Sequence, residues 1–423
     1  MNVLMLSWEY PPRVVGGLGR HVHALATALV RAGHEVVCVS RDHPDAPPDT
    51  VVDGVRIVRV SEDPPLVPFE ELLAWVMAFN HGLSRAALAV VEDFQPDVIH
   101  AHDWLVAHTA KTVKDHTGLP LVATVHATEA GRHQGFLPGP VNRAIHSVEW
   151  WLTYEARRVI TCSAYMRDEV RGLFLLPPEK TDVVPNGIDL AHWHADSERV
   201  AAMRAHLSPD GAPVILFAGR LEYEKGVQTA LQALPRLRRR HPGLRLVVAG
   251  VGGHEAELVA LAKRLRVSRA VEFMGFLDPE DLAVLAASAD CALVPSIYEP
   301  FGMVALESAA AGTPLVVADT GGLREFVDHN FTGLRFAPGD HAGLADAVTR
   351  LLGDEVLGQR MVREARAVLA AGYTWEAIAR RTADVYARSV REERALLAGF
   401  VAEARVPLRV LYGRSDLLAG SDE

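Results

Sequence analysis

Short runs of aliphatic and β-branched residues alternate along the chain with longer stretches whose apolar residues recur at helical spacing. In the first half, the apolar runs predict strands at Val3–Ser7, Glu35–Val39, Val55–Val60, Asp97–His100, Leu121–Val125 and Arg158–Thr161. The stretches between them predict helices, such as Leu18–Arg31, Phe69–Val91 and Trp150–Ala156. This alternation is typical of parallel α/β construction.

The rhythm breaks at Leu173–Asp189, where prolines and a glycine interrupt the pattern, and we interpret this stretch as the passage between two domains. The alternation then restarts. Strands are predicted at Val214–Ala218, Leu246–Ala249, Val271–Phe273, Cys291–Val294 and Leu315–Val317, and helices are predicted to begin at Gly226, Glu255, Pro279, Met303 and Leu323.

The chain of 423 residues is long enough for two doubly wound domains. We expect an N-terminal Rossmann-like domain over residues 1–190, a C-terminal Rossmann-like domain over residues 191–372, and a final helix with a tail over residues 373–423. Doubly wound sheets bind ligands at the carboxyl ends of their strands. Two such sheets therefore suggest a cleft between facing edges.

Composition narrows the classes of function. Hydrophobic residues make up 49% of the chain and charged residues 23%, so a sizeable core can form. A net charge of -10 argues against nucleic acid as a partner. No apolar run approaches the roughly 20 residues of a membrane-spanning helix. Three widely spaced cysteines indicate buried apolar residues in a reducing compartment. From these two observations together we expect a cytoplasmic protein without a transmembrane segment.

A glycine-rich loop follows the first predicted strand. Its glycines, Gly16, Gly17 and Gly19, lie at the mouth of a helix, where backbone amides can approach a diphosphate and the helix dipole favours negative charge. The G-x-G-x-x-G pattern of dinucleotide-binding proteins is incomplete, because Val22 stands at its third glycine. A plain strand-to-helix turn is the alternative.

A cationic turn, Gly219–Gly226, links the first strand and helix of the second domain. Arg220 and Lys225 would stand at one edge of the sheet, able to stabilise charge on a departing diphosphate. The competing interpretation is a solvated cluster in which the two cations pair with Glu222 and Glu224.

Paired glutamates make Pro295–Glu307 the most informative stretch. Because Pro300 disfavours helical angles at the residue before it, Glu299 belongs to a loop, and a helix should begin near Phe301 or Gly302. The first amides of that helix have no intrahelical partner. A carboxylate can accept hydrogen bonds from sugar hydroxyls, and free amides beside it can donate to a neighbouring phosphate. The carboxylate of Glu307 lies further along the same apolar helix, and burying it without a purpose is costly.

The stretch from Glu299 to Glu307 resembles the E-x7-E motif of glycosyltransferase family 4, whose members are retaining enzymes of the GT-B fold. The resemblance covers almost the whole chain. It includes the glycine loop, the cationic turn, Val184–Asp189, Gly321–Glu325 and Tyr373–Trp375. It implies two facing Rossmann-like domains, with a last helix from Trp375 that crosses back onto the first domain.

The resemblance also implies roles for the donor site. The Glu299 position contacts donor-sugar hydroxyls, and the Glu307 position contacts the nucleotide ribose. Arg220 and Lys225 match residues that clamp the diphosphate, and Gly17 matches a glycine whose amide touches it. The remaining donor-binding candidates are Asn186, Phe301, Gly302 and Met303.

Histidines are numerous, with 19 in the chain. His100 and His102 share one face of a strand, and with Asp103 or His126 they offer a possible metal site. We expect no metal, since neither an H-E-x-x-H helix nor an Asp-x-Asp pair supports one. By resemblance, His126 matches a histidine that supports the donor sugar, which makes it a catalytic candidate together with Arg220, Lys225 and Glu299. For His100, a place in the core is the better interpretation.

The glycogen and starch synthase branch of the family is the most similar, through Trp8–Pro12, Gly16–Gly19 and His102–Trp104. Val14 departs from that branch, which usually carries a lysine there, so ADP or UDP remains open. The acceptor-side candidates are Glu9, His102, Asp103, Arg132 and Arg143.

The predicted reaction transfers a hexose, with glucose as the first candidate, from UDP- or ADP-glucose to a carbohydrate, with α-glucan synthesis as one candidate. The nucleotide sugar is a substrate, and no separate cofactor is expected. The resemblance implies front-face displacement, in which the leaving phosphate takes the acceptor proton. The alternatives are a small or lipid-linked acceptor, or an NAD-dependent oxidoreductase with Asp42 at the ribose. The oligomeric state stays open.

Overall fold

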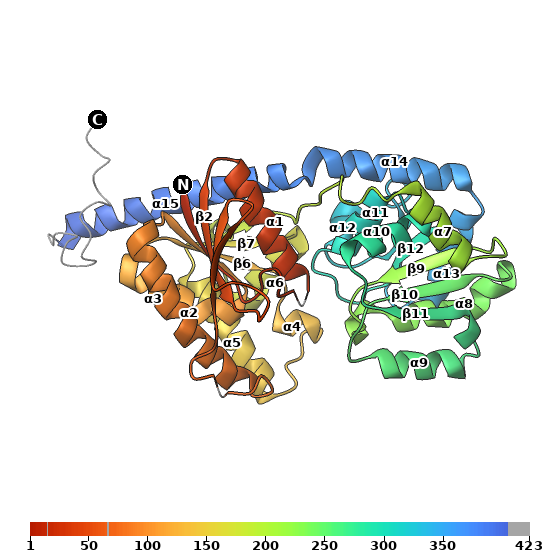
Figure 1. The fold of residues 1–423 in the computed structure, drawn as a ribbon, viewed down its shortest axis with the longest axis horizontal. Helices are drawn as coiled ribbons and strands as arrows, with labels where there is room; N and C mark the ends of the chain where they lie inside the picture. The colour runs from red at the N-terminus through yellow and green to blue at the C-terminus, as the bar shows by residue number, and fades with distance from the viewer. Residues whose placement is uncertain (15, 66, 405–423) are drawn as a thin grey trace. The chain divides into compact units, whose positions relative to one another are not determined.

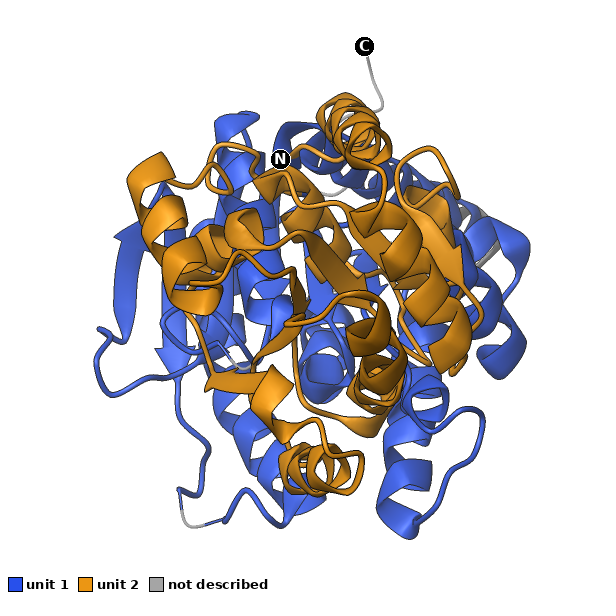
Figure 2. Ribbon diagram, turned by 90° about the vertical axis from the view of Figure 1, so that its right-hand side faces the viewer, with its two compact units in different colours: residues 1–187, 375–423 blue, residues 188–374 orange. Residues whose placement is uncertain are grey.

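The computed structural model describes residues 1–14, 16–65 and 67–404, and the chain divides into two compact units (Figures 1 and 2). Unit 1 holds residues 1–187 and the described chain from Trp375 onward, and unit 2 holds residues 188–374. The sequence predicts domain boundaries at 190 and 372, and the chain changes units after 187 and after 374. The predicted tail beyond residue 404 lies outside the described residues.

Unit 1 contains an eight-stranded sheet in the order β3-β4-β2-β1-β5-β6-β7-β8. Its strands are β1 (Asn2–Leu6), β2 (Glu35–Arg41), β3 (Asp49–Val52), β4 (Val55–Val60), β5 (Val98–His102), β6 (Leu121–Val125), β7 (Arg158–Thr161) and β8 (Thr181–Val183). Every neighbouring pair is parallel except β3 and β4. All six strands predicted in this half are present.

Helices cover both faces of this sheet. They are α1 (Gly17–Arg31), α2 (Leu72–Phe94), α3 (Ala107–Thr117), α4 (Glu129–Arg132), α5 (Pro140–Glu155), α6 (Ala164–Phe174) and α15 (Trp375–Ala404). Val3 and Met5 of β1 share a core with residues of α1 and α15. Leu4 and Leu6 are equally buried and point to the other face, since side chains alternate along a strand.

The last helix, α15, runs along unit 1 (Figure 1). Its apolar face joins the core beside α1, and its polar residues form ion pairs with the sheet edge. Arg157 pairs with Glu393 at 2.6 Å, and Arg388 pairs with Asp182 of β8 at 2.5 Å. The prediction that the final helix packs on the first domain is confirmed.

Unit 2 contains a parallel six-stranded sheet in the order β11-β10-β9-β12-β13-β14. Its strands are β9 (Val214–Ala218), β10 (Arg245–Ala249), β11 (Val271–Gly275), β12 (Cys291–Val294), β13 (Leu315–Ala318) and β14 (Leu334–Phe336). Its helices are α7 (Ser197–Leu207), α8 (Val227–Arg240), α9 (Glu255–Arg264), α10 (Pro279–Ser288), α11 (Met303–Ala311), α12 (Leu323–Phe326), α13 (His341–Leu352) and α14 (Glu355–Gly372). The prediction of two α/β domains with parallel sheets is therefore confirmed.

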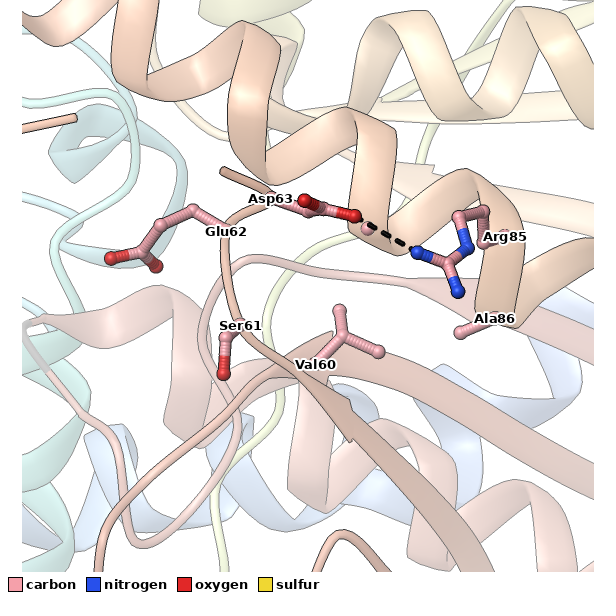
Figure 3. A pocket seen from close by; sticks show the side chains of 7 residues that line it. Val60, Ser61, Glu62, Asp63, Arg85 and Ala86 are labelled. Atoms are coloured by element: carbon pink, nitrogen blue, oxygen red, sulfur yellow. Dashed lines mark hydrogen bonds and ion pairs between the residues drawn. The ribbon is translucent and has the colours of Figure 1, made fainter. Parts of the chain in front are cut away.

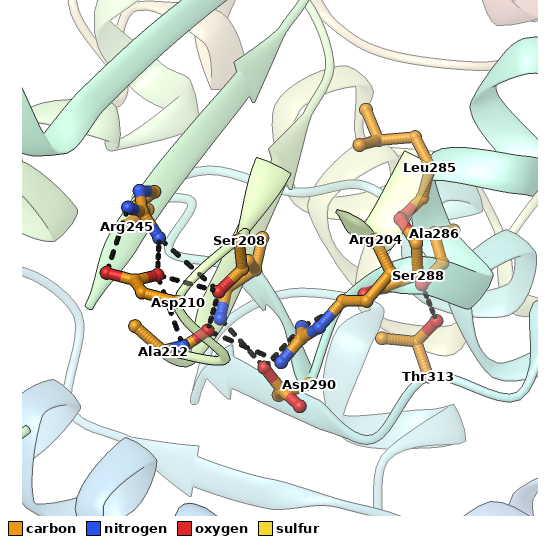
Figure 4. Close-up of polar contacts among 11 residues, drawn as sticks. Arg204, Ser208, Asp210, Ala212, Arg245, Leu285, Ala286, Ser288, Asp290 and Thr313 are labelled. Carbon is orange, nitrogen blue, oxygen red and sulfur yellow. Dashed lines mark hydrogen bonds and ion pairs between the residues drawn. The ribbon is translucent and has the colours of Figure 1, made fainter. Parts of the chain in front are cut away.

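A polar network fastens the amino ends of the unit 2 strands (Figure 4). Oδ2 of Asp290 accepts hydrogen bonds from Arg204 of α7 and from the amide of Val214, both at 2.7 Å. Arg245, the first residue of β10, pairs with Asp210 at 2.7 Å. Because the strands are parallel, this network lies at the edge of the sheet opposite to the carboxyl ends, where the candidate site lies.

Three short strands at the edges of the sheets were not predicted from the sequence. β3 is exposed and shows no alternation, although Asp53-Gly54 after it is a hairpin-turn signal: both residues have positive φ, 53° and 80°. β8 lies inside Leu173–Asp189, which the sequence marks as a passage between domains. That stretch belongs to unit 1 up to Gly187, so the interpretation was wrong for most of its length. β14 has only three residues, too few for a periodic signal.

The three cysteines, Cys38, Cys162 and Cys291, are buried, as the sequence predicts. Among the described residues, every helix is too short or too polar to traverse a bilayer.

Candidate functional site

Each sheet has one place where the order of its strands reverses. In unit 1 it lies between β1 and β5, and in unit 2 between β9 and β12. Open α/β sheets bind ligands outside the carboxyl ends of the strands at this point. The predicted residues follow these strands: Gly17 comes after β1, His102 ends β5, Arg220 and Lys225 come after β9, and Glu299 comes after β12.

In unit 2, Lys225 and Glu299 form a close ion pair. Lys225 ends a short 3-10 turn, Tyr223–Lys225, and its Nζ donates to Oε2 of Glu299 at 2.9 Å. The hydroxyl of Ser296 donates to the same oxygen at 3.1 Å. The side chains of Lys225 and Glu299 are 19% and 11% exposed, so water screens their attraction only in part. The structure thus unites two predicted residues that are 74 positions apart.

Backbone contacts between the loops after β9 and β12 place this pair. The amide of Ile297 donates to the carbonyl of Glu224 at 2.7 Å. Gly226 has a φ of 74°, and a Cβ added there would lie 1.9 Å from the carbonyl oxygen of Pro295. Only glycine suits this position, because it tolerates the positive φ and leaves room for the facing backbone.

A second glycine contact fixes Glu299 from the other side. Gly321 has a φ of 53°, and a Cβ on it would lie 1.9 Å from the carbonyl oxygen of Glu299. The amide of Gly322 donates to that same oxygen at 2.9 Å. The segment Gly321–Glu325, which carries part of the family resemblance, therefore holds the backbone of Glu299.

Helix α11 begins just after this loop. Its first residue is Met303, and Gly302 is the N-cap with a φ of 101°. The helical pattern predicts this start at Met303 correctly, whereas the start near Phe301 or Gly302 inferred from Pro300 is one or two residues early, because a positive φ at Gly302 is not helical. Glu307 is 3% exposed and Glu299 is 9% exposed, so these carboxylates are not the ordinary surface glutamates of the alternative interpretation. Phe301 is buried as well.

Arg220 lies differently from Lys225. Its side chain is 50% exposed, and NH2 donates to Glu224 at 3.3 Å. This is the solvated pairing that the sequence offers as an alternative, and at such exposure it contributes little to stability. The guanidinium can therefore change partners at low cost when an anion approaches.

In unit 1, the glycine loop leads into α1 beside Glu9. Glu9 is 3% exposed, and its Oε2 accepts a hydrogen bond from the amide of Gly16 at 3.1 Å. A Cβ on Gly19 would lie 3.1 Å from the Glu9 side chain, whereas one on Gly17 would meet nothing within 4 Å. Glu9 therefore packs against the loop, and open space remains beside Gly17.

His126 follows β6 and contacts two other histidines. Its Nε2 lies 3.1 Å from Nδ1 of His102, and its ring centroid lies 4.7 Å from that of His21 in α1. Burial lowers the pKa of His126 to about 4, so the ring is neutral at pH 7. The core interpretation of His100 is confirmed. It is fully buried and bonds the hydroxyl of Tyr386 at 2.7 Å.

The remaining acceptor-side and donor-side candidates have varied surroundings. Asp103 has a φ of 60° and accepts from the amide of His126 at 2.8 Å, and burial raises the pKa of its carboxyl to about 6. Arg132 is partly exposed and pairs with Glu129 at 3.7 Å. Arg143 is exposed on α5. Asn186 is buried within unit 1.

A surface hollow elsewhere in unit 1 contains none of these residues (Figure 3). It is lined by Val60, Ser61, Glu62, Asp63, Gly82, Arg85 and Ala86. Two of its lining residues, Arg85 and Asp63, form an ion pair in which NH1 of Arg85 lies 2.9 Å from Oδ2 of Asp63. With no predicted site residue in it, the hollow is not part of the candidate site.

Two residues of the candidate site escaped the sequence analysis. Ser296 bonds Glu299 from within the informative stretch, but a lone serine carries no signal of its own. His21 is four residues beyond Gly17 in α1, which is one helical turn, so it faces the same end of the sheet as the glycine loop. Helical spacing from Gly17 could have identified it.

Known families match nearly the whole chain. Residues 15–192 match the family described as Glycosyltransferase Family 4, and residues 199–368 match the family described as Glycosyl transferases group 1. A curated glycogen synthase from Mycobacterium tuberculosis is 47% identical over 408 residues, which cover 93% of this chain and 96% of that protein.

Solved structures with the same fold span both units. Sucrose-phosphate synthase from Thermosynechococcus elongatus matches with a TM-score of 0.79 and 26% identity, over 92% of this chain and 98% of that one. The catalytic domain of starch synthase IV from Arabidopsis thaliana, bound to ADP and acarbose, matches with a TM-score of 0.73 and 20% identity, over 92% and 99% of the two chains. The latter likeness bears on the fold alone.

Proposed function

We propose that this chain, which belongs to glycosyltransferase family 4, transfers a glucosyl group from UDP- or ADP-glucose to an α-glucan with retention of configuration. The chain is a hexosyltransferase with two Rossmann-like domains. The oxidoreductase alternative is therefore wrong. Asp42, the residue that the oxidoreductase alternative places at the ribose, accepts a hydrogen bond from Ser61 at 2.6 Å.

The observation that carries the proposal is the buried pair of Lys225 and Glu299 at the strand reversal of unit 2. A lysine beside a carboxylate suits a sugar diphosphate, because the cation can stabilise the phosphate while the carboxylate accepts from sugar hydroxyls. In the proposal, Arg220 shares the diphosphate with Lys225. Glu307 binds the ribose, which its burial in α11 supports.

The amides at the start of α11 supply further donor contacts in the proposal. The helix begins at Met303 after Gly302 and Phe301, and a helix N-terminus favours a negatively charged group. In unit 1, the open space beside Gly17 suits a phosphate oxygen, and Asn186 is proposed to bind the donor as well.

For the chemical step, we propose front-face displacement. The acceptor hydroxyl attacks the anomeric carbon as the bond to the diphosphate breaks, and the leaving phosphate oxygen takes the acceptor proton. Arg220 and Lys225 stabilise the charge on the leaving group. His126 is neutral at pH 7, so its proposed role is to hydrogen-bond the donor sugar rather than to carry charge.

The relatives bear on the acceptor. An α-glucan is the first candidate because the 47% identical relative is a glycogen synthase. A small phosphorylated sugar is the second, since a 26% identical structure is a sucrose-phosphate synthase and exposed cations at Arg132 and Arg143 suit a phosphate. Glu9, His102 and Asp103 complete the proposed acceptor side.

A nucleotide-release screen tests the proposal. UDP-glucose and ADP-glucose are each incubated with the chain, alone and with glycogen, maltose or a hexose phosphate, and free nucleoside diphosphate is measured. We expect release that depends on one donor and one acceptor class, and loss of release in Glu299→Gln. Equal release with and without every acceptor would contradict glycosyl transfer. An inverted product would contradict retention.

A further inference from the structure

Three imidazoles from three elements of unit 1 meet at the carboxyl end of its sheet. His21 comes from the second turn of α1, His102 is the last residue of β5, and His126 directly follows β6. One ring nitrogen of each lies within 4.8 Å of the other two. We propose that His21, His102 and His126 bind one divalent transition-metal ion, with zinc as the best-suited ion.

An unsatisfied ring nitrogen points to a ligand at this place. Nε2 of His102 is buried and has no hydrogen-bond partner among the described residues. His21 is buried beside it, and Asn186 offers its ring a side-chain hydrogen bond. Buried polar atoms are normally bonded, so an unmet nitrogen within a cluster of three imidazoles calls for a partner. A metal ion among the three rings would bond one nitrogen of each.

The spacing suits tetrahedral zinc. Zinc–nitrogen bonds of about 2.0–2.1 Å at tetrahedral angles place two ligand nitrogens about 3.3 Å apart. Nδ1 of His102 and Nε2 of His126 are already 3.1 Å apart. The widest nitrogen separation in the cluster, at most 4.8 Å, must close by about 1.5 Å to reach that spacing. The proposal requires the His21 ring to make this shift by side-chain rotation.

The ligand set selects the kind of ion. Neutral imidazoles suit zinc, copper and nickel, whereas magnesium and calcium require oxygen ligands. An imidazole binds a metal ion through an unprotonated ring nitrogen, and each neutral ring has one. The hydrogen shared by His102 and His126 moves to the other nitrogen of its ring. No redox step is involved.

The surroundings support an ion with an open fourth position. Oδ1 of Asp103 accepts from the backbone amide of His126 at 2.8 Å, which fixes the loop that carries this ligand. His100 lies beside His102 with ring centroids 4.1 Å apart and ring planes tilted by 42°, and its own bond to Tyr386 anchors it. His126 is only half-buried, so water can complete the coordination.

Metal binding here goes beyond glycosyl transfer and does not depend on it. If His126 contacts the donor sugar as proposed above, an ion on its ring removes that contact. We therefore expect zinc to inhibit the enzyme and a chelator to restore it. The binding itself is measured without any substrate.

Equilibrium dialysis of the chelator-treated full chain against zinc chloride at pH 7.5 tests the site. Because 19 histidines create weak background binding, the readout is a difference between variants. His21→Gln removes one ligand, and His116→Gln removes an exposed histidine of α3 as the matched control. We expect one tight equivalent in the wild type and in His116→Gln. In His21→Gln the zinc affinity should fall by about 100-fold. Loss of a residue that merely hydrogen-bonds a metal ligand already lowers affinity by about 10–100-fold, so loss of a ligand itself should reach the upper end of that range.

X-ray absorption of the zinc-loaded wild type keeps the proposal testable if His21→Gln does not fold. Three imidazole nitrogens at about 2.0–2.1 Å would support the site. Zinc bound equally by the folded His21→Gln variant, or a spectrum with fewer than three imidazoles, would overturn it. Nucleotide release by the metal-free chain is assayed separately, so a failed metal site and a failed glycosyl transfer remain distinguishable.

Discussion

Replacing Lys225 by alanine removes the cation from the pair that the candidate donor site depends on. Lys225 Nζ lies 2.9 Å from Oε2 of Glu299, and Ser296 is the one other described residue that donates to that oxygen. The substitution therefore has two separable effects. It leaves a buried carboxylate with one neutral donor, and it removes a charge that would stabilise a leaving diphosphate.

Their magnitudes follow from burial and charge. Breaking a buried pair costs about 3–5 kcal/mol, and the 19% exposure of Lys225 reduces this to roughly 2 kcal/mol of folding stability. For catalysis, one lost donor to a developing oxyanion costs about 3 kcal/mol. That corresponds to roughly a 150-fold lower kcat, since 1.36 kcal/mol is tenfold in rate.

The assay is nucleotide release at saturating donor and acceptor, with thermal unfolding measured on the same samples. Lys263→Ala, at an exposed position of α9 in the same unit, is the matched control and should keep full kcat. Lys225→Ala with undiminished kcat would refute the role in the chemical step. A double variant with Glu299→Gln that regained kcat would show that Lys225 serves only to neutralise Glu299.

Three further substitutions test separate parts of the reasoning. Burial raises the pKa of Glu149 to about 8, above its unfolded value, so its protonated form stabilises the fold below about pH 4.5 and that contribution disappears as pH rises through about 8. Glu149→Gln should flatten the loss of stability in thermal melts between pH 5 and 8.5, and an unchanged pH profile would contradict the assignment. Arg204→Ala should lower stability by roughly 1–2 kcal/mol in urea unfolding while kcat stays unchanged, because its bonds fasten the amino ends of the strands; a fall in kcat at full stability would contradict this. Gly226→Ala should unfold far more easily than Gly211→Ala. Both glycines have similar φ, 74° and 73°, but only the first would place a Cβ 1.9 Å from the Pro295 carbonyl; equal melting temperatures would contradict the close contact.

Buried strands were predictable because their signal is local. β9, β12 and β13 are unbroken apolar runs, and a strand covered on both faces favours that pattern wherever it lies in the chain. β14 and β8 have three residues each, and β3 is largely exposed, so none buries enough apolar surface to mark the sequence. Their places depend on pairing with a neighbouring strand, which the sequence of the strand itself does not encode.

The donor-side residues of unit 2 were predictable for a different reason. The turn with Lys225 and the loop with Glu299 each stand next to a strong strand, so the rule for doubly wound sheets places them together once the strands are identified. What the sequence does not reveal is how the loops meet. The contacts of Gly226 with Pro295 and of Gly321 with Glu299 are long-range packing, and a glycine in a sequence shows only that a side chain is absent.

The histidine cluster was harder to predict because its members share no spacing. His102 ends β5 and His126 follows the neighbouring β6, and the sequence offers His100 and His102 with Asp103 or His126 as a possible ligand set. The structure instead aims the Asp103 carboxylate at the amide of His126 and brings His21 from α1 as the third ring. A ligand on a helix joins two on strands only through the packing of α1 against the sheet. Neither the helical period of 3.6 residues nor the strand period of 2 residues contains that information.

The ion pairs of Arg220 and Lys225 affect how an anionic donor would bind. Both candidate cations already have a carboxylate partner, Arg220 with Glu224 and Lys225 with Glu299. A diphosphate would therefore exchange one anionic partner for another, and the gain in Coulomb energy is smaller than for two unpaired cations. With a net charge of -10 the chain does not attract the donor from a distance. Binding must then draw on short-range donors, namely the first amides of α11, while the carboxylate that Lys225 releases becomes available to sugar hydroxyls. In the proposed donor complex, the same exchange would make the pair responsive to substrate, since Glu299 would gain sugar hydroxyls as Lys225 gains the phosphate.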